Sequence, residues 1–178
     1  MRGFAGVMMG LVATILSACA TAPPLPRETG AGVFIVEQDL VGRTTARGEF
    51  RTITGVRRGF AAELAGAWDG RVLTLREEFA FDDGERDTKT WRLTRVAPGL
   101  YEGTREDVVG VARGFQDGRA FRLEYNIRLP GRDGRPGRLV RFRDVMVRTS
   151  DGVVINRATI GWRGLRVGGV DLSIRRVS

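Results

Sequence analysis

The sequence predicts an all-β protein, one antiparallel up-and-down β-barrel of about 8–10 strands. From Gly42 onward, short stretches alternate apolar and polar residues with a period of two, as strands with one buried face do. Turn signals rich in Gly, Asp and Pro divide these stretches roughly every 8 to 12 residues, and no long segment has a helical period. Sequential strands with short connections favour a closed barrel, since closure removes exposed edges. A two-sheet β-sandwich is the alternative.

Ten segments carry the alternating pattern, and the barrel that they predict is lipocalin-like in broad architecture. They span residues 44–54, 57–65, 71–81, 88–96, 100–105, 108–115, 120–129, 138–149, 153–163 and 167–176. Several connections hold Asp-Gly pairs, as in Trp68-Asp69-Gly70 and Ser150-Asp151-Gly152, which suit tight hairpins. The stretch 61–65 has helical composition, but Gly59 and Gly66 bracket it, so we expect a strand there. Residues 33–41 form either a short helix or a strand that packs at one end.

The first eighteen residues have the organisation of a secretory signal peptide. Arg2 precedes an uninterrupted run of apolar and small residues that is too short to span a bilayer as a helix. The run ends in Leu16-Ser17-Ala18-Cys19, which resembles the lipobox of bacterial lipoproteins, and Cys19 is the only cysteine. We therefore expect cleavage of residues 1–18 and lipid attachment at Cys19, because two or more acyl chains anchor a protein stably.

The residue after the cysteine bears on the membrane in which the anchor sits. Ala20 stands where Asp would cause retention in the inner membrane, by resemblance to the sorting pattern of diderm lipoproteins. This favours the inner leaflet of the outer membrane, with the protein in the cell envelope facing the periplasm. Residues 22–26 read Ala-Pro-Pro-Leu-Pro, which predicts a flexible, extended tether over residues 19–32 and a single barrel domain over 33–178.

Composition narrows the chemistry that the domain can perform. The chain has no His and one Cys, which excludes His-based metal sites, Cys/His nucleophile pairs and internal disulfides. The formal net charge of +8 rests on arginines and a single lysine, and a cell-envelope location argues against a nucleic-acid partner. We expect no cofactor and no metal, because the acidic segment 82–87 lacks the spacing of a calcium loop and is typical of a turn.

Two carboxylates fall on apolar faces of predicted strands. Glu77 shares a face with Leu75 and Phe79, and Asp144 lies between Phe142 and Met146 on another face. A buried carboxylate without a partner costs several kcal/mol, so both should be paired. The candidate interior polar network or ligand site consists of Glu77, Lys89, Asp107, Asp144, Asn156 and Arg157.

This network has two interpretations. It is either a satisfied ion-pair network that fixes strand register, or the polar floor of a cavity that orients a largely apolar ligand. Catalysis by the two carboxylates is less favoured, because no nucleophile or metal motif accompanies them. The candidate barrel-lining residues are Leu75, Phe79, Trp91, Gly110 and Ala112. Gly110, Ala112 and Gly114 alternate on one face, which predicts either unfilled interior space or bends in the wall.

Ordered motifs along the chain resemble an uncharacterised bacterial lipoprotein family, domain-of-unknown-function family 3833. The motifs are Trp68-Asp69-Gly70, Leu73-Thr74-Leu75 with Glu77, Phe79-Ala80-Phe81-Asp82-Asp83-Gly84, Trp91, Tyr101-Glu102-Gly103, Asp107-Val108-Val109-Gly110, Asn156-Arg157-Ala158 and Arg166-Val167-Gly168. The chain departs from the family pattern at Arg143 and Val145, which puts a site around Asp144 in doubt. The resemblance implies a lipocalin-like barrel and no catalytic residues. Its members often accompany lipid-modifying enzymes, which favours a lipid as ligand.

These expectations combine into a non-enzymatic lipoprotein, anchored to the outer membrane, that binds or shields a lipophilic small molecule of fatty-acid or phospholipid type. A non-catalytic envelope-maintenance or interaction protein with a packed core is the alternative, and a lipid-modifying enzyme comes third. No feature indicates a particular protein partner. The arginines around the Gly/Pro-rich loop 130–137 either form a solvated loop or contact anionic lipid headgroups.

Overall fold

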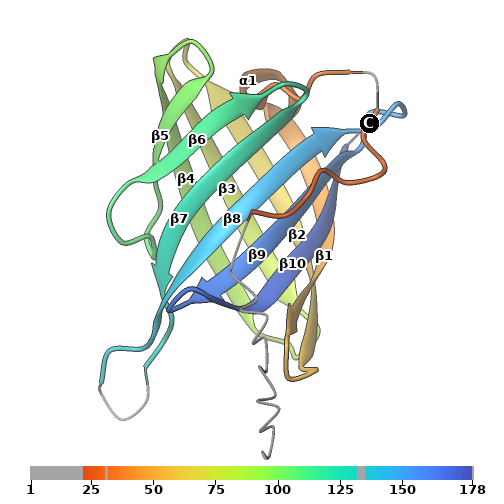
Figure 1. The fold of residues 1–178 in the computed structure, drawn as a ribbon. Coiled ribbons are helices and arrows are strands. Elements are labelled where there is room, and N and C mark those ends of the chain that lie inside the picture. The colour runs from red at the N-terminus through yellow and green to blue at the C-terminus, as the bar shows by residue number, and fades with distance from the viewer. Residues whose placement is uncertain (1–21, 31, 132–134, 178) are drawn as a thin grey trace, which may run out of the picture.

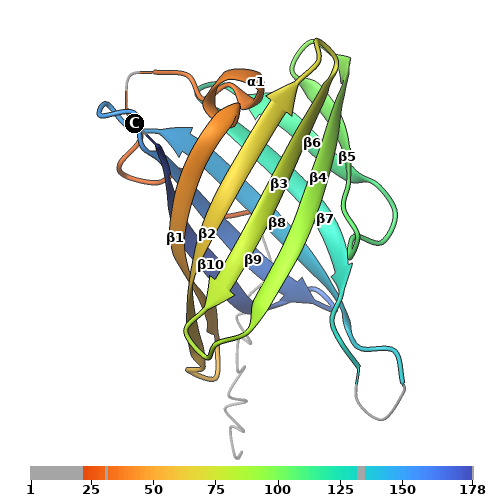
Figure 2. The same cartoon turned by 180° about the vertical axis from the view of Figure 1, so that it is seen from behind.

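The computed structural model describes residues 22–30, 32–131 and 135–177. Within these residues, ten antiparallel strands form one closed barrel in which each strand pairs with its neighbours in the chain (Figures 1 and 2). The strands are β1 (Gly42–Thr52), β2 (Arg57–Trp68), β3 (Val72–Phe81), β4 (Arg86–Ala97), β5 (Leu100–Thr104), β6 (Ala112–Asp117), β7 (Ala120–Arg128), β8 (Leu139–Arg148), β9 (Val154–Trp162) and β10 (Leu165–Arg176). Pairing of β1 with β10 closes the sheet. The predicted barrel is confirmed, and the sandwich is wrong because a single sheet closes on itself.

Turn glycines separate the strands much as the sequence indicated. Gly70, Gly84 and Gly152 have φ angles of 99°, 88° and 82°, a conformation that a residue with a side chain rarely adopts. The stretch 61–65 lies inside β2, as expected. The predicted strand 108–115 is wrong in its first residues: β6 begins at Ala112, and Gly110 lies in the preceding loop with a φ of 80°.

A short helix closes one end of the barrel. α1 (Val36–Asp39) precedes β1 and lies across that end, which we call the α1 end (Figure 1). Phe34 and Val36 point into the barrel and are fully buried, and the backbone N–H of Ile35 donates to Asp39 Oδ2 at 2.8 Å. Residues 33–41 therefore take the helical form of the two that the sequence allowed. Within the described residues, no helix has the length and apolar composition needed to cross a bilayer.

The Pro-rich N-terminal segment lies against the outer wall of the barrel. Residues 22–30, expected to belong to a flexible tether, cross the outer face of β7, β8 and β9 (Figure 1). Arg122 donates to the Pro23 carbonyl at 3.1 Å, Glu28 pairs with Arg157 at 2.9 Å, and the Gly30 N–H donates to the Arg148 carbonyl. This cover explains why Val145 and Val147, which point away from the interior, form a buried satellite cluster with Ala120. The signal-peptide and Cys19 predictions lie outside the described residues.

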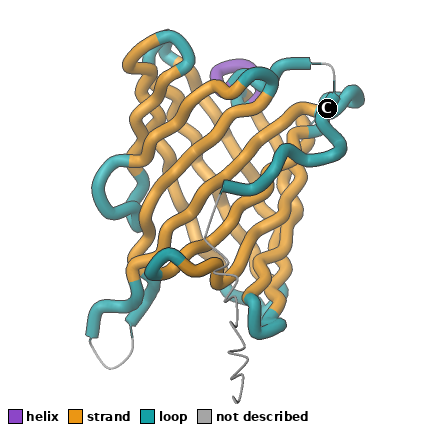
Figure 3. The backbone as a smooth tube through the Cα atoms, in the orientation of Figure 1, coloured by secondary structure: helices purple, strands orange, loops and turns teal. Residues whose placement is uncertain are grey.

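The end opposite α1 is formed by strand connections and no described helix (Figure 3). The β1–β2 turn, the β3–β4 turn, the β7–β8 loop and the β9–β10 turn all lie at this far end (Figures 1 and 2). The β5–β6 connection also points toward this end, but it begins partway along the wall because β5 is only five residues long. The up-and-down order requires this arrangement, because every second connection returns to the same end.

Candidate functional site

The barrel interior is packed differently at its two ends. Near α1 the inward-facing side chains are sealed: Leu73 and Phe121 are 0% exposed and Leu93 is 3% exposed. Toward the far end Phe60 is buried, but five other inward-facing aromatic side chains are only half-buried; they are Phe50, Phe79, Phe81, Phe142 and Trp162. The interior is therefore sealed at the α1 end, whereas several of its aromatic side chains keep part of their surface exposed at the far end.

Polar side chains gather in the interior where these two regions meet. We call Glu77, Arg105, Asp107, Tyr125 and Asp144 the interior polar cluster. Arg105 Nη1 lies 3.6 Å from Glu77 Oε2, and Arg105 Nε donates to Asp107 Oδ1 at 2.8 Å. The Tyr125 hydroxyl donates to Asp144 Oδ2 at 3.2 Å. One guanidinium group thus serves two carboxylates, while the third carboxylate depends on a tyrosine.

Aromatic rings surround the central arginine. The Arg105 guanidinium lies 4.7 Å from the ring centroid of Trp91 and 5.5 Å from that of Tyr125. Trp91 and Tyr125 meet edge to face at 5.0 Å, and Tyr125 stacks on Phe142 at 5.2 Å. The ring faces offset part of the cost of removing the Arg105 charge from water. The cluster is therefore polar at its centre and aromatic around it.

Burial shifts the protonation of both interior carboxyls toward neutral pH. The pKa of Glu77 is raised to about 7 by burial, against the opposing charge of Arg105, and the charge of Asp144 raises it further. The pKa of Asp144 is also raised to about 7 by burial, although hydrogen bonds from Tyr125 and Asn156 and the charge of Arg105 oppose the shift. Both groups therefore change charge in a pH range in which unperturbed carboxyls stay ionised.

Three acceptor atoms of this region are buried and accept no hydrogen bond within the described part of the chain. They are Glu77 Oε2, Asp144 Oδ1 and Asn156 Oδ1. Arg105 approaches Glu77 Oε2, but the geometry is that of an ion pair without a hydrogen bond. Buried polar atoms nearly always have a partner, so these atoms are positioned to accept from water or from the polar group of a ligand.

The structure assembles some of the predicted network and excludes one member. Glu77 and Asp144 both face the interior, as their strand faces predicted, and Asn156 faces inward next to Asp144. Lys89 lies opposite Glu77 in the β3–β4 register, but its ammonium binds Asp87 at 3.0 Å and approaches Asp107 at 4.0 Å. Arg157 points outward and pairs with Glu28 and Asp171, because its neighbour Asn156 takes the inward position. The prediction that Arg157 belongs to the interior network is therefore wrong.

The predicted barrel-lining residues separate in the same way. Leu75, Phe79, Trp91 and Ala112 face the interior, whereas Gly110 lies in the β5–β6 loop and lines nothing. The small residues do not leave space: a Cβ on Gly114 would lie 2.5 Å from Phe121 Cζ, and a Cβ on Gly103 would lie 2.5 Å from Leu93 Cδ2. The glycines admit large side chains from neighbouring strands, so they mark close packing and not unfilled interior space.

Two central members of the cluster were missed by sequence reasoning. Arg105 follows Tyr101 and Gly103 at a period of two, so its inward face was readable from the alternation. Tyr125 lies between Leu123 and Ile127 on an apolar face in the same way. What the alternation does not supply is the partner of each side chain across the barrel.

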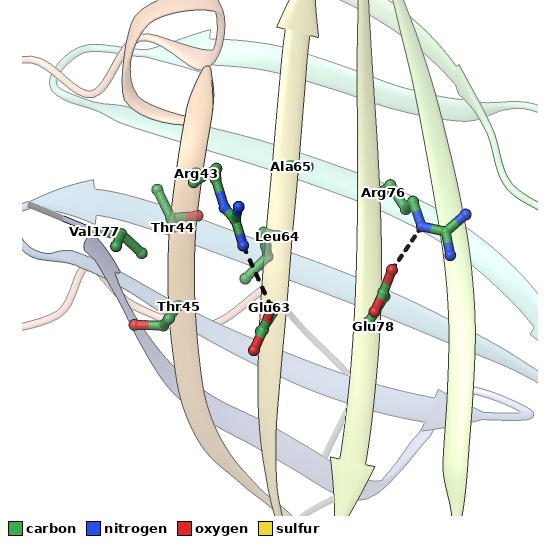
Figure 4. A pocket seen from close by; sticks show the side chains of 9 residues that line it. All are labelled: Arg43, Thr44, Thr45, Glu63, Leu64, Ala65, Arg76, Glu78 and Val177. Carbon is green, nitrogen blue, oxygen red and sulfur yellow. Dashed lines mark hydrogen bonds and ion pairs between the residues drawn. The ribbon is translucent and has the colours of Figure 1, made fainter.

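Grooves on the outer wall are less specific candidates for a binding site. The groove in Figure 4 runs over β1, β2 and β3 and is lined mainly by outward-facing side chains. Arg43 pairs with Glu63 at 3.8 Å, and Arg76 pairs with Glu78 at 2.9 Å, both in exposed positions. Exposed ion pairs of this kind stabilise by little and define no binding chemistry. Among the residues that the structure describes, no group of three possible metal ligands occurs.

Comparison with known proteins identifies the family. A family model described as a protein of unknown function, DUF3833, matches residues 13–176. The chain belongs to the DUF3833 family. The resemblance inferred from the motifs is thereby confirmed, and a search of curated proteins gives this DUF3833 protein no match.

A solved structure shares the fold of this DUF3833 protein. It is the S-type phycobiliprotein lyase CPES from Guillardia theta, with a TM-score of 0.57 and 12% sequence identity. The match covers 79% of this chain and 90% of that chain. At this level of identity the likeness shows the fold alone, and it confirms the lipocalin-like architecture.

Proposed function

We propose that this DUF3833 protein is a lipoprotein, acylated at Cys19 and anchored in the inner leaflet of the outer membrane, whose barrel binds a lipophilic small molecule of fatty-acid or phospholipid type. The apolar part of the ligand lies among the half-buried aromatic rings of the far half of the interior. Its polar end reaches the interior polar cluster.

One observation carries this proposal: a region of half-buried aromatic side chains ends at buried acceptor atoms to which no described group donates a hydrogen bond. Phe79 and Phe142 line the region, and Glu77 and Asp144 lie beside them on the same strands. Apolar walls with a few convergent polar groups are the usual composition of a small-molecule site. A network that served stability alone would satisfy its own acceptors.

The cluster repels an acidic headgroup less below neutral pH, because it then carries less negative charge. Glu77 and Asp144 take up protons near pH 7, after which Arg105 and Lys89 face the two carboxylates of Asp87 and Asp107. An anionic ligand would further favour the protonated forms of Glu77 and Asp144, so its binding is coupled to proton uptake. Affinity for a fatty acid should therefore decrease as the pH rises above 7.

A fluorescent fatty acid tests the binding site. Every described contact of the barrel lies between residues 22 and 177, so a chain of residues 20–178 retains the fold. We expect cis-parinaric acid to bind this chain, and Arg105→Gln to weaken binding by tenfold or more, since hydrogen bonds to charged groups contribute about 1.5–3 kcal/mol. Arg113→Gln, an exposed outward-facing change on β6, is the matched control and should bind like wild type. Absence of binding, together with no lipid in extracts of the purified protein, would refute the proposal.

The anchor is tested separately on the full chain. Cys19→Ala should move the protein from the outer-membrane fraction to a soluble or unprocessed form. Unchanged membrane fractionation of this variant would contradict acylation and would leave the binding proposal to its own test.

A further inference from the structure

The far end of the barrel combines exposed apolar side chains with exposed basic ones. We call this set the amphipathic rim; it consists of Ile53, Val56, Leu129, Leu139 and Leu165 with Arg128, Arg135, Arg138, Arg141 and Arg163. The residues come from the β1–β2 turn, the β7–β8 loop with the start of β8, and the β9–β10 turn (Figure 1). Ile53 and Leu165 are 68% and 53% exposed. The Ile53 N–H donates to the Val167 carbonyl, which joins two of these turns into one surface.

The charge of the rim has one sign. None of its five arginines forms an ion pair with a carboxylate of the described residues. The described residues of the segments 50–57, 128–141 and 163–166 include eight arginines and no carboxylate. Of these, Arg51 and Arg57 pair with Glu49, and Arg51 also pairs with Asp171. The β3–β4 turn at the same end differs, because it is acidic: Arg58 pairs with both Asp83 and Glu85 and offsets only part of their charge. Among the described residues, the positive charge without a carboxylate partner is thus concentrated on the β7–β8 loop, the start of β8 and the β9–β10 turn, while the β1–β2 turn contributes exposed apolar side chains.

A tryptophan lies at the centre of the basic region. The guanidinium of Arg138 lies 4.8 Å from the ring centroid of Trp162, and that of Arg163 lies 5.0 Å from it. Trp162 is half-buried, so part of the residue stays exposed beside the two charges. Tryptophan flanked by arginine is a combination enriched where proteins meet the headgroup region of a bilayer.

We propose that the amphipathic rim docks on an anionic lipid bilayer. Arginine binds phosphate oxygens through paired N–H groups, and exposed aliphatic side chains insert at the boundary between headgroups and acyl chains. A surface that recognised phosphate alone would need the arginines but not the aliphatic residues, so their mixture selects a lipid surface. Docking places the far end of the barrel interior against the membrane. This inference goes beyond the proposed function and holds whether or not the interior contains a ligand.

Vesicle flotation of residues 20–178 tests the docking. We expect flotation with vesicles of phosphatidylcholine and phosphatidylglycerol, and none with phosphatidylcholine alone. Arg128→Gln/Arg135→Gln/Arg138→Gln should weaken binding on the order of a hundredfold, because each basic residue near an anionic surface contributes about fivefold. The matched control Arg71→Gln/Arg92→Gln/Arg113→Gln removes the same charge from exposed positions outside the rim and should retain most of the affinity.

A second variant tests the apolar part without touching the β7–β8 loop. Ile53→Ser/Leu165→Ser changes two exposed side chains, so it leaves the fold intact and should still weaken flotation by about tenfold or more. Equal losses in the rim and control triple variants would overturn the proposal, because binding would then follow net charge alone. Failure to bind anionic vesicles, or a dimer that the rim variant abolishes and vesicles do not displace, would also overturn it. Unchanged cis-parinaric acid binding by Ile53→Ser/Leu165→Ser, which alters none of the interior aromatic rings, keeps this result separate from the proposed function.

Discussion

Glu77 makes the stability of the barrel depend on pH in a range where little else in the chain titrates. Burial raises its folded-state pKa from 4.5 to about 7, so the folded chain keeps this proton where the unfolded chain has lost it. The contribution to the free energy of unfolding is therefore largest below pH 4.5 and decreases as the pH rises toward 7. Asp144 acts in the same direction, from 3.8 to about 7.

The pKa shift of Glu77 sets the magnitude of the effect. Each group lowers the free energy of unfolding by about 1.4 kcal/mol per pH unit between its unfolded and folded pKa values. Glu77 alone accounts for about 3 kcal/mol, and Asp144 adds less than its separate share because both carboxyls interact with Arg105. The chain has no histidine, so the loss between pH 5 and pH 8 belongs mainly to these two residues. Carboxyls with lowered pKa values, such as Asp69, stabilise the folded chain above their pKa, and this stabilisation is lost only at more acidic pH.

Urea unfolding of residues 20–178 at pH 5 and pH 8 measures this dependence. Glu77→Gln stays neutral, so we expect it to exceed wild type by about 2–3 kcal/mol at pH 8 and to match it within about 1 kcal/mol at pH 5. Glu78→Gln is the matched control, because Glu78 is the next residue, points outward and pairs with the exposed Arg76. It should keep the wild-type pH dependence. The reasoning is refuted if wild type and Glu77→Gln lose the same stability between pH 5 and pH 8.

Three further substitutions test the packing and the cluster by urea unfolding. Phe34→Ala removes a fully buried ring from the α1 end and should cost about 3–5 kcal/mol; a loss below 1 kcal/mol would show that the end is not sealed. Gly114→Ala places a methyl group against the Phe121 ring and should cost about 1–3 kcal/mol, and a neutral effect would contradict the contact. Tyr125→Phe removes a hydrogen bond to Asp144 and should cost about 1–2 kcal/mol at pH 8; a loss confined to pH 5 would contradict that role.

Local rules were enough to predict the barrel and its inward-facing carboxylates. Turn glycines such as Gly70 and Gly152 mark the ends of strands because their backbone conformation interrupts a ladder. Strand alternation then fixes which face a residue takes, and so Glu77 and Asp144 were placed inside from their apolar neighbours. The same rule excludes Arg157 once Asn156 is inside, since consecutive residues of a strand face opposite ways.

The assignment of partners needed the closed sheet. Glu77 lies opposite Lys89 in register, which suggested that pair, yet Arg105 reaches Glu77 from beyond the end of β5. Curvature of the wall and the irregular segment after β5 decide that contact, and neither is encoded in the period of two. Gly110 illustrates the same point, because its positive φ ends the pattern two residues before β6 begins.

The sequence predicted the Pro-rich N-terminal segment but not its contact with the outer wall of the barrel. The residue pattern of β8 nevertheless indicates that such a contact exists. Val145 and Val147 face outward yet are apolar, and a strand that is apolar on both faces needs a cover on each. Pro23 provides part of that cover, and it lies only four residues after Cys19. A fully extended chain of that length spans at most about 14 Å, so the proposed acylation would hold the barrel wall close to the bilayer. Such a short connection raises the effective concentration of the amphipathic rim at the membrane. Even a weak affinity of the rim for lipid would then keep it bound to the bilayer most of the time.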